Sequence, residues 1–299
     1  MPAFTVADVD TLMRKLLGDT NPSTGDLYTD TYNIEYIQSA YRYVARELCT
    51  AGVTLFRKQT ASWTLPQGVT AAWYARIGTP FFTGAGVDDL TFGGNYTGSA
   101  VGVYVIEIDV QGAPDTFEWS YNGTVVASGV AITGTAQTLN NGVTITFATT
   151  TGHTLTNSWT GVVLPSDFLR PIMLREVGGD QELIQSNGFL PEVAQTATLQ
   201  GAYDWYDNAI WFIGATGDVT IQMQYEPQLP TVTATTDLIR IPDGLDAVAN
   251  KACALAAAAR GQNNDVKTFL ADAAQATAYI IQSESKAQSP VGTQMGRGN

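Results

Sequence analysis

The sequence predicts an α+β fold, in which helices near both ends of the chain enclose a long strand-rich middle. Apolar residues recur at helical spacing near residues 5–51 and 243–286, whereas alternating and β-branched stretches fill the region between them. Between Gly78 and Gly161 the chain carries no lysine or arginine. The acidic residues of this stretch are Asp88, Asp89, Glu107, Asp109, Asp115 and Glu118. Such a change of composition predicts a β-domain inserted into a helical host domain.

Two amphipathic helices are expected in the first 51 residues. The first should begin at Thr5, whose hydroxyl can cap it, with Asp8 in the positively polarised first turn, and it should end at Gly18. Its apolar face comprises Val6, Val9, Leu12, Met13, Leu16 and Leu17. A second helix, at about residues 33–51, would be about 28 Å long, which is enough for a main strut of the domain.

The middle of the chain predicts strands. Stretches 53–65 and 69–77 are rich in β-branched and aromatic residues. Further along, Asn122-Gly123 and Asn141-Gly142 each separate two strand-like runs, as in a tight hairpin whose two central residues need positive φ. Short strands separated by glycine-rich turns are typical of a small β-sandwich, which we expect at residues 79–161.

The last third of the chain predicts a return to helical structure. Residues 243–260 form an alanine-rich amphipathic segment, and a second such segment covers about 264–286. We therefore expect one discontinuous helical domain with a small β-sheet, made of residues 1–78 and 162–287. Residues 288–299 lack apolar periodicity and are expected to form a flexible tail.

The net charge of −13 disfavours specific binding of nucleic acid, because a polyanion is repelled by an acidic surface. A conduit for DNA remains compatible with this charge, since a channel must not adhere to the molecule that passes through it. The start of the chain lacks the basic flank and apolar run of a signal peptide, and no stretch approaches the length of a membrane span. Synthesis in a cytoplasm is expected.

The sequence offers few groups for catalysis. His153 is the sole histidine, and its turn-like surroundings predict a solvated loop residue. The pair Asp8 and Asp10 is interpreted as helix-start charge, and Asp88 and Asp89 as solvated loop charge, although carboxylate pairs also serve glycosidases and calcium sites. Cys49 and Cys253 are interpreted as small buried hydrophobic residues. No enzyme activity, cofactor or metal is therefore expected.

Four aromatic residues cluster in the sequence after residue 200: Trp205, Tyr206, Trp211 and Phe212. Aromatic rings can form a platform for sugars, because their faces bind the apolar faces of sugar rings. A packed sheet or a subunit interface uses the same residues more often, and we favour that interpretation.

Several segments resemble tailed-phage head-to-tail adaptor proteins. They are Tyr225 to Pro230, Ile241-Pro242-Asp243 opening the alanine-rich helix pair, Leu164 to Arg170, and Arg46-Glu47-Leu48 at the end of the second helix. Residues 115–120 and 142–159 are similar to an immunoglobulin-like β-sandwich module of phage structural proteins. The resemblance covers the host domain and the inserted domain separately.

This resemblance implies a virion structural protein, made in the bacterial cytoplasm, that forms a homo-oligomeric ring, usually of twelve copies. Such a ring docks under the portal protein at the neck, receives the tail or nozzle protein, and lets the genomic DNA pass without sequence-specific binding. Cyclic rings use heterologous contacts, which suit rigid helices. An alternative is a virion decoration protein whose β-sandwich recognises a host glycan.

The tail is the predicted portal contact, since it can order on the portal or on a neighbouring subunit. Its candidate contact residues are Gln288, Ser289, Pro290, Val291, Gly292, Thr293, Gln294, Met295, Gly296 and Arg297.

Overall fold

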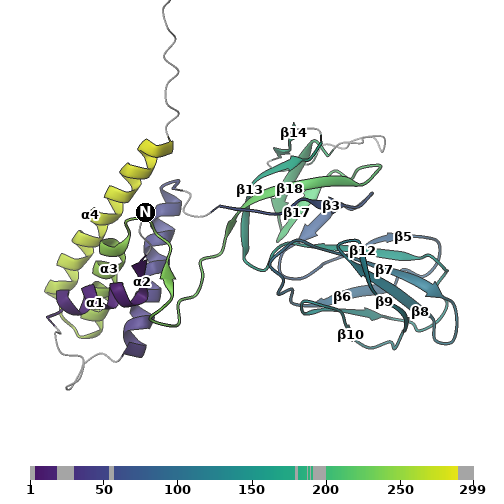
Figure 1. The fold of residues 1–299 in the computed structure, drawn as a ribbon, viewed down its shortest axis with the longest axis horizontal. Coiled ribbons are helices and arrows are strands. Elements are labelled where there is room, and N and C mark those ends of the chain that lie inside the picture. The colour runs from purple at the N-terminus through teal and green to yellow at the C-terminus, as the bar shows by residue number, and fades with distance from the viewer. Residues whose placement is uncertain are drawn as a thin grey trace, which may run out of the picture. The chain divides into compact units, whose positions relative to one another are not determined.

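The computed structural model describes residues 4–18, 30–53, 57–178, 181–186, 188, 190 and 200–288. It confirms the α+β fold class: helices lie near the two ends of the chain and strands dominate between them (Figure 1). The chain divides into two compact units. We call residues 1–56 with 229–299 the helical unit and residues 57–228 the β unit. The predicted limits of the inserted domain, 79 and 161, fall within the β unit.

The helical unit contains four helices and one small two-stranded sheet in its described residues. Their bounds are α1 (Val6–Leu16), α2 (Asp30–Thr50), α3 (Leu245–Ala259), α4 (Asn263–Gln288), β1 (Phe4–Thr5) and β19 (Leu238–Ile239). The predicted cap of the first helix is confirmed, because Thr5 Oγ1 accepts from the Asp8 amide and Asp8 accepts from the Thr5 amide at 2.7 Å. β1 pairs antiparallel with β19, so the two chain ends are also joined by strands.

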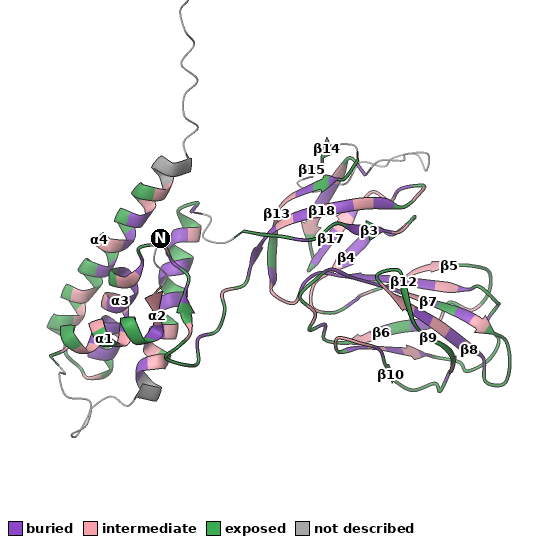
Figure 2. Cartoon of the chain, viewed as in Figure 1, coloured by how far each residue is buried: buried purple, intermediate pink, exposed green. Residues whose placement is uncertain are grey.

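One hydrophobic core unites the two ends of the chain in the helical unit. α3 packs against α4, α2 and α1. Its alanines allow close approach: Ala249, Ala252 and Ala256 are fully buried (Figure 2). Met13 of α1 and Leu48 of α2 belong to the same core. The helices of residues 1–51 and 243–286 therefore fold as one body.

The described β unit is built of strands alone, apart from its turns. In chain order they are β2 (Lys58–Gln59), β3 (Trp63–Leu65), β4 (Ala71–Trp73), β5 (Phe81–Thr83), β6 (Leu90–Gly94), β7 (Gly102–Val110), β8 (Thr116–Tyr121), β9 (Thr124–Ala131), β10 (Gln137–Thr138), β11 (Val143–Phe147), β12 (Ser158–Val163), β13 (Phe168–Glu176), β14 (Gln181–Glu182), β15 (Ile184–Gln185), β16 (Ala202–Tyr206), β17 (Ala209–Phe212) and β18 (Val219–Pro227). The predicted strand at 53–65 is replaced by β2 and β3, and that at 69–77 is limited to β4, since Ala75 has a φ of 63°.

Three sheets make up the β unit. The largest runs β15-β16-β17-β4-β12-β7-β8-β9, with β5 also paired to β12. A three-stranded sheet, β10-β11-β6, packs over part of it, and β14-β13-β18-β2 with β3 forms the third sheet. The strands of residues 79–161 share the largest sheet with β4 and β17, because β12 pairs with β4 as well as with β7.

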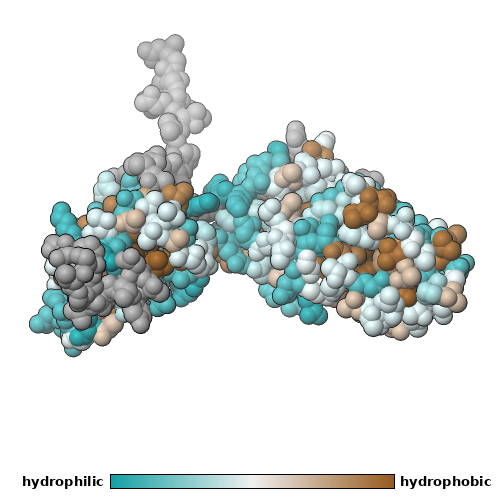
Figure 3. Space-filling view, turned by 60° about the horizontal axis from the view of Figure 1, so that its bottom comes forward, coloured by the Kyte–Doolittle hydropathy of each residue, from teal (hydrophilic) through white to brown (hydrophobic). Residues whose placement is uncertain are grey.

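The β unit has two hydrophobic cores. One surrounds Phe168, Ile210 and Ile221, and the other surrounds Phe147 and Trp159. The second core lies almost wholly within residues 77–163 and fills the sandwich between the three-stranded sheet and β7, β8 and β12. Hydrophobic side chains also reach the surface of both units (Figure 3).

Both predicted hairpin turns are confirmed. Asn122 and Gly123 have φ of 50° and 77°, and Asn141 and Gly142 have φ of 50° and 78°. The first turn joins β8 to β9, and the second joins β10 to β11. These are the conformations that glycine and asparagine adopt most readily.

Candidate functional site

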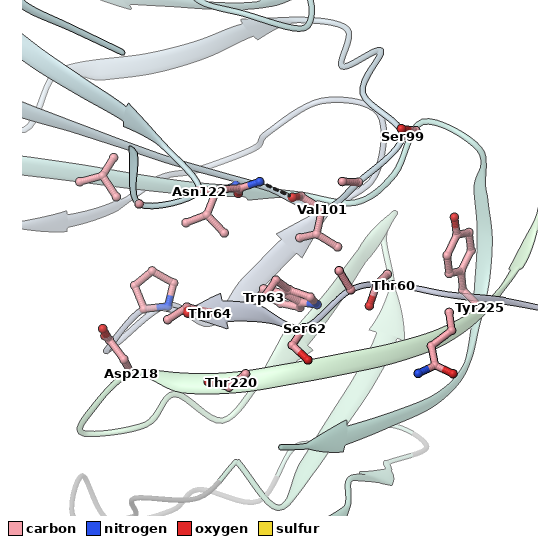
Figure 4. Close-up of a pocket in the computed structure, with 17 residues that line it drawn as sticks. Thr60, Ser62, Trp63, Thr64, Ser99, Val101, Asn122, Asp218, Thr220 and Tyr225 are labelled. Atoms are coloured by element: carbon pink, nitrogen blue, oxygen red, sulfur yellow. Dashed lines mark hydrogen bonds between the residues drawn. The ribbon is translucent and has the colours of Figure 1, made fainter. Parts of the chain in front are cut away.

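A cavity of about 600 Å³ opens in the β unit beside β3 (Figure 4). One wall consists of residues 59–64 with Thr220 and Tyr225 of β18. Val101, Val103 and Asn122, from β7 and the segments next to it, line the other wall. Residues more than 150 positions apart in the sequence thus surround one space, which is why sequence patterns did not reveal it.

The polar groups of this cavity are mostly hydroxyls and one indole N–H. Thr64 and Thr220 lie directly opposite each other on β3 and β18. Trp63 is 7% exposed, and its Nε1 has no hydrogen-bond partner in the described part of the chain. The Asn122 side chain already makes hydrogen bonds within the chain. It accepts from the Val103 amide at 2.8 Å and donates to the Val101 carbonyl at 3.1 Å.

The charge at the cavity is negative. Asp218 is the one acidic residue that lines the cavity, no basic residue lines it, and Asp218 accepts from the Gln67 amide at 2.9 Å. Tyr225 donates its hydroxyl to Asp167 at 2.9 Å. Burial, together with this carboxylate, raises the pKa of Tyr225 above its usual value, so the phenol stays neutral.

The prediction that His153 is a solvated loop residue is wrong. Its side chain is fully buried between two carboxylates in the sandwich core. Nδ1 lies 2.9 Å from Asp115 Oδ2 and Nε2 lies 3.0 Å from Asp89 Oδ1. Phe147 and Trp159 pack edge-on to the ring. Asp89 and Asp115 are 64 and 38 residues away in the sequence, so the local turn pattern concealed the contact.

Both carboxylates are held ionised. Burial alone raises the pKa of Asp115, but hydrogen bonds from the Gly112 amide and from His153 outweigh it and leave the pKa below its usual value. The pKa of Asp89 is lowered in the same way, against burial, by His153 and Thr149. Ionised carboxylates only accept hydrogen bonds, so each of them is satisfied where the His153 ring nitrogen that faces it carries a hydrogen.

The geometry of His153, Asp89 and Asp115 indicates a structural role for these residues. They lie in the closed core of the sandwich, with the His153 side chain wholly shielded from solvent. Asp88 belongs to the same region and accepts from Trp159 Nε1 at 2.7 Å. The interpretation as solvated loop charge is therefore wrong for Asp89, whose side chain is only 10% exposed beside His153, whereas Asp88 is an exposed loop residue as predicted. The described residues contain no group of three or more potential metal ligands.

The remaining candidates from the sequence lie in the helical unit. Asp8 lies in the first turn of α1 as predicted, and Asp10 accepts from Arg14 and Asn33. Cys253 is fully buried, and burial raises the pKa of its thiol to about 12, in agreement with a small hydrophobic role. Cys49 is only half-buried, so the prediction that it is a buried residue is wrong.

The aromatic residues Trp205, Tyr206, Trp211 and Phe212 mostly pack against other rings of the β unit. This agrees with a packed sheet rather than a sugar platform. Phe212 is 2% exposed and contacts Trp63, and Trp205 packs edge-on to Phe168. Trp211 is stacked on Tyr206, with ring centroids 5.3 Å apart. Tyr206 alone of the four is mostly exposed, at 51%, so one free ring face remains where a broad sugar platform would need several.

Two faces of the helical unit differ in charge. A groove of about 650 Å³ between α3 and α4 is lined by Asp243, Asp246, Asp272 and Tyr279, with no lysine or arginine. On α2, Arg42, Tyr43 and Arg46 are exposed, and Lys251 of α3 lies 3.4 Å above the Tyr43 ring. α2 and α4 lie on different sides of α3 (Figure 1). We call these faces the acidic groove and the basic ridge.

The tail predicted to contact the portal lies outside the described residues, except for the backbone of Gln288 at the end of α4. The candidates Ser289, Pro290, Val291, Gly292, Thr293, Gln294, Met295, Gly296 and Arg297 thus remain predictions. None of the helices in the described ranges has the length and apolar character needed to span a membrane.

Comparisons with known proteins place the chain in no family. No protein-family model matches the sequence, and no curated protein matches it. Among solved structures, the flagellar hook junction protein FlgK from Burkholderia pseudomallei is similar at 11% identity and a TM-score of 0.21. The match covers 87% of this chain and 60% of that one. A likeness this weak carries no argument about fold or function.

Proposed function

We propose that this chain is a structural subunit of a tailed bacteriophage particle, forming the adaptor ring that joins the portal to the tail. The class of protein that we propose comes from the resemblance of residues 1–77 and 162–287 to head-to-tail adaptors. The observation that carries it further is the pair of oppositely charged faces on the helical unit. A ring needs such a pair, because each copy contacts its neighbour through two different surfaces.

The acidic groove and the basic ridge are complementary. The groove presents three exposed aspartates and the ring of Tyr279, which is 66% exposed. The ridge presents Arg42, Arg46 and Lys251 near Tyr43, which is 49% exposed, together with one exposed carboxylate, Glu47. In a chain of net charge −13, a concentration of three cations is distinctive. Tyr279 and Tyr43 would become buried in the contact between copies and would supply most of the affinity. The charges would set the orientation and the speed of association.

The ring would sit at the virion neck between portal protein and tail or nozzle protein, and would line the DNA exit channel. The acidic composition supports passage without adhesion, since a polyanion gains no counterion release on such a surface. We propose no reaction for the chain. The described residues unite no nucleophile, base and oxyanion donor in one cleft, and the one histidine is engaged in a buried ion cluster.

Charge reversal tests this contact directly. Asp246→Arg with Asp272→Arg makes the groove basic, and Arg42→Asp with Arg46→Asp makes the ridge acidic. Each variant alone should be monomeric by native mass spectrometry and light scattering, because its two faces repel. An equimolar mixture should assemble again, since each reversed face then meets a complementary one.

Asp265→Arg with Lys267→Asp is the matched control, because both side chains are exposed on α4 and neither lines the groove. This control should assemble like the unchanged chain. Assembly of both reversed variants alone, or failure of their mixture, would show that the ring is held by other surfaces. Binding of portal protein by such a ring would then still support the adaptor role.

A further inference from the structure

We infer that the cavity beside β3 is a binding site for a short neutral oligosaccharide. This inference concerns the β unit and does not depend on the adaptor ring. The volume of about 600 Å³ lies within the range of about 300–1,000 Å³ that is typical of small-ligand sites. Charge, hydrogen-bonding groups and apolar surface each narrow the class of ligand.

Charge excludes anionic ligands. No lysine or arginine lines the cavity, and Asp218 contributes a negative charge at its rim. Phosphates, nucleotides and acidic sugars would therefore lose solvation without gaining a cationic partner. A neutral ligand avoids this cost.

The hydrogen-bonding groups match a polyhydroxyl ligand. The hydroxyls of Ser62, Thr64, Ser99 and Thr220 line the cavity and make no hydrogen bond to other parts of the described chain. A hydroxyl both donates and accepts, as a sugar hydroxyl does. Because Thr64 and Thr220 are cross-strand partners, their hydroxyls present one paired edge to the ligand.

Trp63 adds a donor with no partner. Trp63 lines the cavity in the segment between Thr60 and Thr64 (Figure 4), and its indole N–H is shielded from solvent. An unsatisfied buried donor is unfavourable in the empty protein, so an oxygen that reaches it gains more than an ordinary surface hydrogen bond. A small outward shift of the ring, which packs edge-on to Phe212, would bring the N–H to the ligand.

The opposite wall is apolar. Val101, Val103 and Val105 follow each other at every second position, so they form one strip on the same face. Such a strip suits the C–H face of a sugar ring. An extended peptide fits less well, because β3 has only three residues and ends at Leu65, directly before Pro66, which makes the strand edge a poor template for pairing.

The test is a titration of the ¹⁵N-labelled full chain, observed through the indole N–H signals of its tryptophans. Maltotriose, cellotriose and tri-N-acetylchitotriose are the probes, at millimolar concentrations. At least one should move the Trp63 signal, which Trp63→Phe assigns by its loss. The Trp159 signal should stay in place, since that N–H is bound to Asp88. In Trp63→Phe, followed through the backbone amide signals of the same ¹⁵N-labelled chain, binding should weaken about tenfold, as expected for the loss of one buried donor.

Two further variants separate the cavity from the rest of the surface. Ser99→Trp should fill the entrance and abolish binding, whereas Ser128→Trp, at an exposed position of β9 away from the cavity, should leave it unchanged. Sialyllactose should bind more weakly than the neutral probes. The inference is overturned if no neutral probe moves the Trp63 signal, if Ser99→Trp binds normally, or if uncharged hexapeptides bind and the saccharides do not.

Discussion

Replacing His153 with leucine is expected to lower the free energy of unfolding of the β unit by about 3–5 kcal/mol. The substitution removes the imidazole that lies between Asp89 and Asp115, and the Asp115 side chain is only 2% exposed. Thermal and urea unfolding, followed by the near-ultraviolet signal of the sandwich tryptophans, measures the loss. A loss below about 1 kcal/mol would contradict the buried ion cluster, because surface ion pairs have that magnitude.

The same variant has a defined pH dependence. Asp89 and Asp115 have lowered pKa values in the folded protein, so their contribution is complete above the unfolded value of about 4 and is lost as the pH falls through the folded values. The difference in stability between the unchanged chain and His153→Leu should therefore shrink below about pH 4. Adding Asp89→Asn and Asp115→Asn to His153→Leu should recover part of the loss at neutral pH, because the uncompensated charges are gone.

Replacing Ala252 with leucine is expected to destabilise the helical unit by about 1–3 kcal/mol through overpacking. Ala252 is fully buried in α3, which packs against the three other helices, and the close helix approach leaves no room for three more carbon atoms. The loss should appear in helical circular dichroism during urea unfolding.

Ala258→Leu is the matched control for this prediction. Ala258 lies on the same helix but is exposed, so the added side chain meets solvent. Its stability should change by less than about 0.5 kcal/mol. Equal losses for the two variants would mean that α3 is not the centre of the helical unit.

The sequence predicts local structure correctly where neighbouring residues alone determine it. The cap at Thr5, the apolar faces of the four helices and the two asparagine-glycine hairpins depend on residues within a few positions of each other. The fold class follows from these elements. Strand bounds were less accurate: Ala75 adopts positive φ and ends β4 early, which no apolar pattern encodes.

The sites were hidden because they depend on tertiary contacts. His153 meets Asp89 and Asp115 only after the sandwich closes, and the turn around it reads as solvated. Thr64 and Thr220 both line the cavity. They face each other because β3 pairs with β18, although the two strands are far apart in the sequence. A lone histidine among several aspartates in an otherwise cation-free stretch was the one signal of a buried ion cluster, and it was available at residues 78–161.

In the proposed ring, the helical unit of each copy is held by the helical units of its neighbours. The most direct test is the mass of the full chain, measured by native mass spectrometry and negative-stain imaging, alone and with portal protein. Closed rings, formed alone or on the portal, are the expected result. A chain that stays monomeric under both conditions, at concentrations well above those of assembly in an infected cell, would contradict the adaptor role.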